Sequence, residues 1–460
     1  MAPTLPVELI LETILLSLDT APTTTRALSS SSSPSSSSSS TSPLLHSDDP
    51  PGATTSPSSR TALLRSCALA SRTLRSLSQP LLFRHPVLPS PSSLRTFVAA
   101  VENAEEGARP GEAVRSLTVG EVDVGAHVGA SGWNGAEVDL GRLDRVCGNV
   151  RALTLRGVER VRLDDLAEMR HLRTLTIAGS SLAPTRGRPP VALPVTDLAL
   201  AHCRLSPSSL DPALFPSVKA LQLVVPGASR AAPDELVAFL RGVAPQLRSL
   251  SVHDEAAHEP ATSLSLVPGL VESIYDAVPL MTSLAHLDVV NAIPTHALSL
   301  LPLSTLSSLH TISLSLSGVL ASGALRKKLR WTPLADSLLH DALAALRILL
   351  LPPDALFPYK GALADDLAAL PSWVRALQQS EELERVVLPP RAFEDGLGEM
   401  VRELRGELER WGRRVVLVDG GGEADSDGEG ASAGGGFWRE VRASERDERE
   451  RRRAGEEVSL

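Results

Sequence analysis

The residues of this chain that could do chemistry are few, and their spacing argues against an active site. The stretch HDEAAHE, His253 to Glu259, combines histidines with acidic side chains, which are residue types that bind zinc. Its two histidines are five residues apart, and on a helix that spacing turns them away from each other, so they cannot share one metal ion. We therefore expect a loop or a surface polar cluster at this stretch, and no metal site.

A second candidate is the glycine-rich stretch GASGWNG, Gly129 to Gly135. A phosphate-binding loop of the Walker type needs a Gly-Lys pair, whose lysine reaches the phosphates, and the sequence contains no such pair. The three cysteines, Cys67, Cys147 and Cys203, are far apart and odd in number. That pattern favours buried thiols in a reducing compartment. The sequence thus indicates neither an enzyme nor a cofactor.

Composition limits the partners and the compartment. Hydrophobic residues make up 43% of the chain and aromatic residues only 3%, so the core must consist mainly of aliphatic side chains. A formal net charge of −9 gives no general reason to expect nucleic acid or an anionic membrane as a partner. The first apolar run contains Glu8 and Glu12, which argues against a signal peptide, and no run is long enough to span a membrane. We expect a soluble protein of the cytoplasm or nucleus.

A hexamer with apolar first, fourth and sixth positions recurs through the middle of the chain. Ten copies begin at residues 114, 150, 172, 195, 218, 247, 284, 309, 346 and 383. The starts at 150, 172, 195 and 218 are 22, 23 and 23 residues apart, and the later steps are longer. Such a period predicts stacked units of one strand and one return segment, because a single unit cannot bury its own apolar face.

One unit carries a more specific pattern. In VTDLALAHCRL the side chains of Val195, Leu198, Leu200, Cys203 and Leu205 match the leucine-rich-repeat pattern L-x-x-L-x-L-x-x-N/C-x-L. The region 110–418 therefore resembles a leucine-rich-repeat solenoid. That resemblance implies a strand-lined concave face and a ninth position that serves a buried turn. Other units depart from the pattern at this ninth position, and a non-repetitive α/β domain is the alternative.

The two ends of the chain differ in composition from the middle. Residues 21–59 are rich in serine, threonine and proline, which predicts a disordered insert. Residues 419–460 comprise a glycine-rich acidic linker and a charged tail. We interpret the tail as a solvated charged helix, with a specific docking element as the alternative.

Two amphipathic stripes flank the serine-rich insert. Val7, Ile10 and Leu11 begin the first stripe, and Leu63, Cys67 and Ala70 begin the second, both at helical spacing. Each stripe lacks a partner nearby in the sequence, so we expect residues 1–20 and 60–88 to pack as one helical unit. A flexible insert would not prevent this, since loop-closure free energy grows only with the logarithm of loop length.

Joined without the insert, these two segments resemble an F-box. The stretch LPVELI, Leu5 to Ile10, matches the family's start, and Ser71 with Arg72 matches its Ser-Arg step, whereas Leu74 replaces a usual aromatic residue. The resemblance implies the substrate-recognition subunit of a Skp–cullin–F-box ubiquitin ligase, with a Skp-type adaptor and, through it, a cullin as partners. The adaptor-binding residues it implies are Leu5, Pro6, Leu9, Ile10, Leu63 and Leu64.

The overall prediction is an α/β chain with a short N-terminal helical F-box-like unit followed by a leucine-rich-repeat-like solenoid. An unknown protein target would bind the spacer residues of the hexamers, which should leave the core side of the strands. The predicted target-binding residues are Arg173, Thr174, Thr176, Asp197, Lys219, Gln222, Arg248, His286 and Asp288. The alternative is a leucine-rich-repeat interaction scaffold without a ubiquitin-ligase link, whose N-terminal helices only cap the repeats.

Overall fold

The structure is a computed structural model of the 460-residue chain. It describes residues 78, 81–104, 110–120, 138, 140–167, 169–184, 191–206, 208–225, 233–254, 274, 276–289, 305–313, 346–351, 363–364, 367–368, 370, 383–393, 397–410, 416–419, 437, 441–446 and 449–450. One compact unit contains Phe83–Gly421 and Ala431–Leu460, and the other contains Met1–Leu82 and Gly422–Gly430. The strands between Val87 and Asp419 all lie in the first of these units. Within the described ranges, no helix is both long and apolar enough to cross a membrane.

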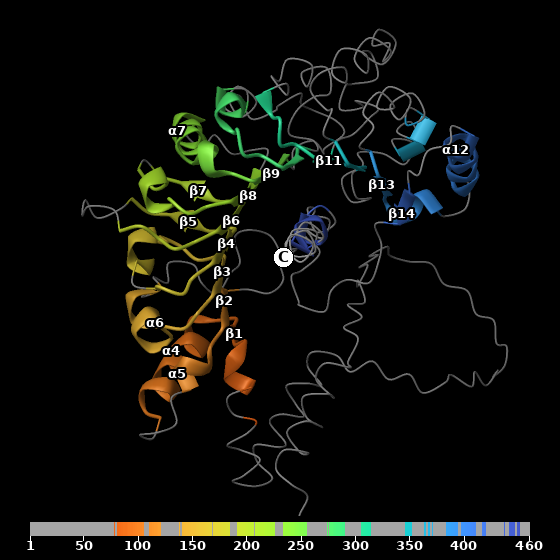
Figure 1. Ribbon diagram of the computed structural model, residues 1–460. Helices are drawn as coiled ribbons and strands as arrows, with labels where there is room; N and C mark the ends of the chain where they lie inside the picture. The colour runs from red at the N-terminus through yellow and green to blue at the C-terminus, as the bar shows by residue number, and fades with distance from the viewer. Residues whose placement is uncertain are drawn as a thin grey trace, which may run out of the picture. The chain divides into compact units, whose positions relative to one another are not determined.

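A 12-stranded parallel sheet runs through this unit, in the order β1-β2-β3-β4-β6-β8-β9-β10-β11-β12-β13-β14 (Figure 1). Apart from β5 and β7, which pair separately, each strand follows its sequence neighbour, and every pair is parallel. The strands are β1 (Val87–Leu88), β2 (Ser116–Gly120), β3 (Ala152–Arg156), β4 (Thr174–Ala178), β5 (Ser181–Leu182), β6 (Asp197–Ala201), β7 (Arg204–Leu205), β8 (Ala220–Val225), β9 (Ser249–Asp254), β10 (His286–Asp288), β11 (Thr311–Ser313), β12 (Ile348–Leu350), β13 (Arg385–Leu388) and β14 (Val416–Asp419).

The hexamer pattern places ten of these strands. From β2 to β13, each hexamer contributes one strand of the large sheet, and the strand begins at the third residue of its hexamer. Wherever the structure describes them, the first, fourth and sixth positions are buried, as Leu172, Leu175 and Ile177 show with exposed fractions of 0%. Burial of each such side chain contributes about 1.5–3 kcal/mol of transfer free energy. Stacking joins the buried side chains of neighbouring units into one aliphatic core. The predicted α/β class is therefore confirmed, and the large parallel sheet is consistent with the predicted leucine-rich-repeat-like solenoid.

Helices and short 3-10 turns return the chain from one strand to the next. Their core-facing residues join one cluster with the inward strand residues, so they cover one face of the sheet. These elements are α4 (Pro91–Glu102), α5 (Pro110–Ala113), α6 (Leu140–Val146), η1 (Leu163–Leu166), η2 (Pro212–Leu214), α7 (Pro233–Val243), η3 (Ala244–Gln246), η5 (Val278–Leu280), η8 (Pro390–Phe393) and α12 (Gly398–Arg410).

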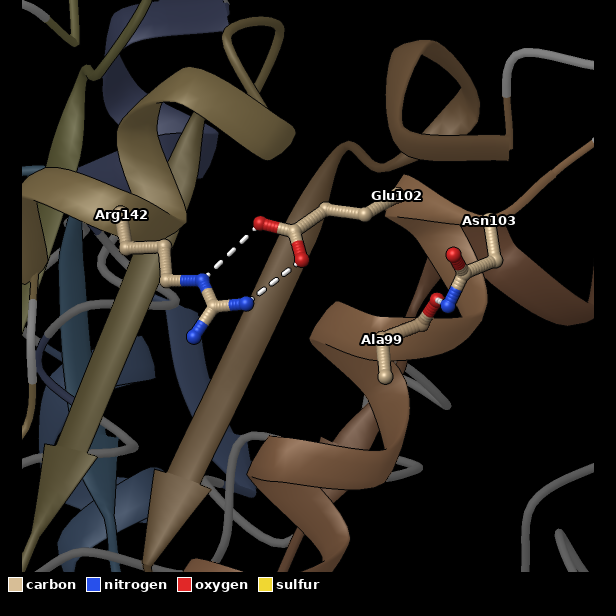
Figure 2. Close-up of polar contacts among 4 residues, drawn as sticks. All are labelled: Ala99, Glu102, Asn103 and Arg142. Carbon is tan, nitrogen blue, oxygen red and sulfur yellow. Dashed lines mark hydrogen bonds and ion pairs between the residues drawn. The ribbon is translucent and has the colours of Figure 1, made fainter.

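Helix α4 shows how local sequence sets an element and its neighbour. Ser90 caps the helix by accepting from the backbone N–H of Ser93 at 3.1 Å, and Pro91 occupies the first turn, where a missing N–H costs nothing. At the other end, Glu102 accepts two hydrogen bonds from Arg142 of α6, from Nε at 2.9 Å and Nη2 at 2.5 Å (Figure 2). This contact lowers the pKa of the Glu102 carboxyl and ties α4 to α6.

The buried turn after a strand depends on the ninth position of the unit, as expected. Cys203 donates from Sγ to the carbonyl oxygen of Ile177 at 3.3 Å. In the preceding unit Ser180 has the same role: its Oγ donates to the Ala178 carbonyl at 2.9 Å and accepts from the Val158 N–H at 3.0 Å. A small polar or thiol group here therefore satisfies backbone groups that would otherwise be buried without a partner.

The sheet extends beyond the hexamers at both ends. The pairing of β1 with β2 begins within the range 60–88, which was expected to belong to the F-box-like unit. Phe83 also packs against the main core, with its ring centroid 5.9 Å from that of Phe97. At the other end β14 pairs with β13. The stretch from Phe83 to Leu88 is therefore the first layer of the solenoid.

Candidate recognition surface

The sheet has a second face, which the return helices do not cover. The third and fifth residues of each hexamer point to it, because the fourth and sixth point into the core. Register pairs the fifth positions in one row, Thr118, Thr154, Thr176, Ala199, Gln222, Ser251, Asp288, Ser313, Leu350 and Val387. The third positions form a parallel row, Ser116, Ala152, Thr174, Asp197, Ala220, Ser249, His286, Thr311, Ile348 and Arg385. We call these two rows the ladder face.

The ladder face from β2 to β8 is polar and reaches solvent. Thr118, Thr154, Thr176 and Gln222 are all half-buried, and Asp197 is exposed. The Thr196 hydroxyl donates to the Asp197 carboxylate at 2.6 Å, which orients that charge. Alanines between these residues keep the surface shallow, so a segment of another protein could approach the sheet closely.

The second positions form a basic row along the edge where the strands begin. We call Arg84, Arg115, Arg151, Arg173, Lys219 and Arg248 the basic edge row. Backbone hydrogen bonds hold it in register, because the N–H of each second residue donates to the carbonyl of the preceding one, at 2.7 Å from Arg151 to Arg115 and from Arg173 to Arg151. Thr196 stands between Arg173 and Lys219 in the same ladder, with bonds of 2.8 Å on both sides.

This register concentrates positive charge. Adjacent strands lie about 4.8 Å apart, which is well inside the Debye length of about 8 Å at physiological salt. All members except Arg115 are exposed. A chain with a net charge of −9 thus carries a local strip of opposite sign.

Farther along the sheet the ladder face is polar and buried. Ser251, His253 and Asp288 are 0%, 2% and 1% exposed. The Nε2 atom of His253 lies 2.8 Å from Oδ2 of Asp288 and 2.9 Å from Oγ of Ser251. The Ser251 hydroxyl also donates to that same carboxylate oxygen, at 3.0 Å.

These three residue types are those of a nucleophilic relay, but their geometry is different. A relay places the carboxylate on one imidazole nitrogen and the hydroxyl on the other. Here both contact Nε2 of His253, and the serine donates to the carboxylate. Such a serine is not activated, so the three side chains form a buried polar cluster. The expectation of a loop or surface cluster at HDEAAHE is wrong for His253, which lies buried in β9.

A pair of histidines adjoins this cluster. His286 and His310 stack edge to face, with ring centroids 4.6 Å apart. Burial, reinforced by the charge repulsion from His310, lowers the pKa of His286 to about 3. His286 is therefore neutral at physiological pH. Within the part of the chain that the structure describes, no group of three or more His, Cys, Asp or Glu side chains could hold a metal ion.

The end of the ladder face is apolar. Ile348, Leu350 and Val387 are 2–5% exposed and form a buried cluster separate from the main core. They stand in the same two rows as the threonines of β2 to β4, so the ladder face changes from polar and accessible to apolar and buried along one sheet.

The predicted target-binding residues divide into three groups. Arg173, Lys219 and Arg248 belong to the exposed basic edge row, and Thr174, Thr176, Asp197 and Gln222 to the accessible part of the ladder face. His286 and Asp288 lie on the ladder face but are 2% and 1% exposed, so the expectation that they face solvent is not met. The predicted adaptor-binding residues Leu5, Pro6, Leu9, Ile10, Leu63 and Leu64 lie outside the described residues.

Sequence reasoning missed several members of this surface, among them Arg84, Arg115 and Arg151 of the basic edge row. The unit that contains Arg84 has Pro86 at its fourth position, so it did not match the hexamer. His253 is the seventh residue of its unit, and continued alternation beyond the hexamer would have placed it on the ladder face.

Comparison with known proteins adds little to these observations. No family model matches the sequence, and no curated protein matches it. Among solved structures, a leucine-rich repeat-containing protein from Legionella pneumophila is similar at 14% sequence identity and a TM-score of 0.37, over 70% of this chain and 98% of that one. The description of the fold therefore stands on the topology and register of the chain itself.

Proposed function

We propose that this chain is a non-catalytic protein-recognition scaffold, whose ladder face from β2 to β8 and basic edge row bind an acidic segment of a protein target. The observation that carries the proposal is the coincidence of the two features over the same repeats. The accessible rows offer hydroxyl and amide groups, and the adjoining edge offers one positive charge for nearly every strand. Positive strips of this kind steer and orient negatively charged partners.

An acidic protein segment fits this surface better than a nucleic acid does. Binding of single strands relies on aromatic side chains on which bases stack, and the two rows between β2 and β8 consist of Thr, Ser, Ala, Gln and Asp. A hydrogen-bonding rim beside a charged edge is instead typical of protein interfaces.

The test is group charge reversal with a matched control. Arg173→Glu, Lys219→Glu and Arg248→Glu together should remove the target from the set of proteins captured by the full-length chain. The control triple Arg145→Glu, Arg402→Glu and Arg405→Glu makes the same change of charge at exposed positions of helices α6 and α12. Unchanged circular dichroism verifies folding. If the basic-row variant keeps every partner, or if both triples lose the same partners, the proposal is wrong.

The link to a ubiquitin ligase is a second proposal, and only the resemblance of the N-terminal segments to an F-box supports it. In that arrangement Leu5, Pro6, Leu9, Ile10, Leu63 and Leu64 anchor a Skp-type adaptor, and the repeats present the target to the ligase. Leu5→Ala with Pro6→Ala should then weaken adaptor capture at least tenfold, since burial of one Leu contributes about 1.5–3 kcal/mol. Deletion of residues 23–58 should leave adaptor capture intact.

Co-purification decides between the ligase subunit and the unlinked scaffold. A Skp-type adaptor and a cullin that co-purify with the full-length chain, and are lost from the Leu5→Ala, Pro6→Ala variant, support the ligase subunit. Capture of a target without any adaptor supports the unlinked scaffold, in which the N-terminal helices only cap the repeats.

A further inference from the structure

The basic edge row runs without interruption along the first four strands of the large sheet. Arg84, Arg115, Arg151 and Arg173 precede β1, β2, β3 and β4, and backbone hydrogen bonds of 2.9, 2.7 and 2.7 Å join each to the next. Within the part of the chain that the structure describes, no acidic side chain pairs with Arg84, Arg115 or Arg151. At the following strand of the sheet, Thr196 takes the basic position. The unbroken run of positive charge therefore spans four strands.

The spacing of this run favours one conformation of an acidic ligand. Adjacent strands lie about 4.8 Å apart, so the run from Arg84 to Arg173 covers about 14 Å. An α-helix rises about 1.5 Å per residue, so its residues i, i+3, i+7 and i+10 extend over about 15 Å and share one side of the helix. Carboxylates at these positions can therefore each meet a different arginine of the run.

An extended segment matches the run less well. Side chains on one side of an extended chain recur about every 6.7 Å, so only about three of them fit along the four arginines, and each step is about 2 Å too long. An extended segment that crosses the strands also needs partners for its own backbone N–H and C=O groups, whereas a helix pairs these groups internally. A helix is therefore the better match.

The ladder face beside this run has the width and the surface that a helix needs. The second and fifth positions of a unit are three residues apart along the chain, which is about 10 Å, and a helix with its side chains is about 10 Å across. The ladder-face side chains of β2, β3 and β4 are half-buried and are either alanine or carry one hydroxyl, so a helix can lie close to the sheet. These side chains are Ser116, Thr118, Ala152, Thr154, Thr174 and Thr176.

We infer that the target presents an α-helix that lies across β1 to β4, with acidic side chains at positions i, i+3, i+7 and i+10 against the basic edge row. The adjoining side of that helix rests on the third and fifth positions of the same strands. This inference rests on the proposed function, because it names the conformation and the charge pattern of the acidic segment. An equally acidic segment with another arrangement engages fewer arginines at once, so the pattern as well as the net charge sets specificity.

Peptide binding to the full-length wild-type chain tests the inference. The first peptide is a stapled helix with glutamates at i, i+3, i+7 and i+10. The second is a stapled helix of the same composition with glutamates at i, i+2, i+7 and i+9, on two opposite faces. The third is a proline-containing, extended peptide with the same number of glutamates at alternate positions. In fluorescence anisotropy, the Kd of the first peptide should be lower than that of either other peptide by a factor of about ten.

Charge reversal locates the binding site. The variant Arg84→Glu, Arg151→Glu should lose the preference for the first peptide, because both residues are exposed members of the run. The control Arg145→Glu, Arg402→Glu makes the same change of charge on α6 and α12 and should keep it. Circular dichroism verifies folding, and the comparison of the three peptides on the wild type does not depend on either variant.

The outcomes separate this inference from the proposed function. Equal binding of the three peptides, or tightest binding of the extended one, overturns the helical pattern and leaves the proposed binding of an acidic segment intact. Failure of all three peptides to bind, or an unchanged preference in the basic-row variant, contradicts both.

Discussion

The burial of His286 predicts a specific loss of stability in mild acid. Its folded-state pKa of about 3 is far below that of an unfolded histidine, about 6.5. As the pH falls below 6.5, the unfolded chain takes up a proton at this position and the folded chain does not. The stabilising contribution of the neutral imidazole is therefore complete above the unfolded pKa and declines through the whole interval down to about pH 3.

The size of this effect follows from linkage. The free energy of unfolding decreases by up to about 1.4 kcal/mol for each pH unit, which gives a loss of about 2 kcal/mol between pH 7 and pH 5. Removing the imidazole with His286→Asn should abolish that part of the pH dependence. The nearby His310 and His253 stay in place, so the prediction concerns the difference between wild type and variant.

The assay is urea denaturation at pH 7 and pH 5, followed by circular dichroism, for the wild type, His286→Asn and the exposed control His171→Asn. Between pH 7 and pH 5, the free energy of unfolding of the wild type and of the control should fall by about 2 kcal/mol more than that of His286→Asn. For each protein, the free energy of unfolding at pH 5 is compared with that of the same protein at pH 7. A general destabilisation by the substitution therefore does not affect the comparison. Equal losses in all three proteins would refute the argument that His286 is buried and neutral.

Three further predictions concern backbone and thiol positions. Gly120→Ala should destabilise by at least about 2 kcal/mol, because Gly120 has a φ of +117° and a Cβ there would lie 1.9 Å from the carbonyl oxygen of Arg156. Gly406→Ala lies inside α12 with nothing within 4 Å of the new Cβ, so it should instead stabilise the folded chain by up to about 1 kcal/mol. Equal shifts of the melting temperature in the two variants would contradict both predictions. Burial raises the pKa of the Cys147 and Cys203 thiols to about 12, so in a Cys67→Ser chain at pH 8 Ellman's reagent should detect thiols only after denaturation. Rapid reaction of the folded chain would show that these cysteines are accessible.

The strands could be predicted because the spacing of their apolar residues follows from which side chains a strand buries against the core. Apolar residues at the first, fourth and sixth positions of a unit are expected when one side of its strand faces the core and the first residue of the unit packs beneath the preceding turn. The terminal strands break that rule for identifiable reasons. The unit of β1 has Pro86 at its fourth position, and the unit of β14 has Arg414 at its first. Among the described residues, β1 and β14 stand at the two ends of the sheet, and each pairs with one strand only.

Burial of the ladder face could not be predicted from the same pattern. The hexamers of β4 and β10 both carry apolar first, fourth and sixth positions, yet Thr176 is half-exposed and Asp288 is 1% exposed. Periodicity describes the contact of a strand with its own core, whereas this difference arises from what lies on the opposite face. Ser251 and Asp288 indicate this burial only when they are considered together. The strand register is needed to show that their side chains lie 3.0 Å apart.

The composition of a row is informative because all its members occupy equivalent places in one sheet. The fifth-position row runs from Thr118 and Thr176 through Asp288 to Leu350 and Val387. Core packing cannot produce this gradient, since these side chains do not face the core. The gradient must therefore reflect a change in what the ladder face contacts.

The basic edge row changes at the same point in the chain. Its last member, Arg248, immediately precedes β9, where the ladder face becomes buried. Beyond it the second positions are Ala285 and His310, and then Arg347, whose charge is already engaged by Glu384 at 3.1 Å. Exposed positive charge and accessible ladder face thus end within the same repeat. These two features share one boundary, which supports the proposal that external recognition belongs to the repeats from β1 to β9.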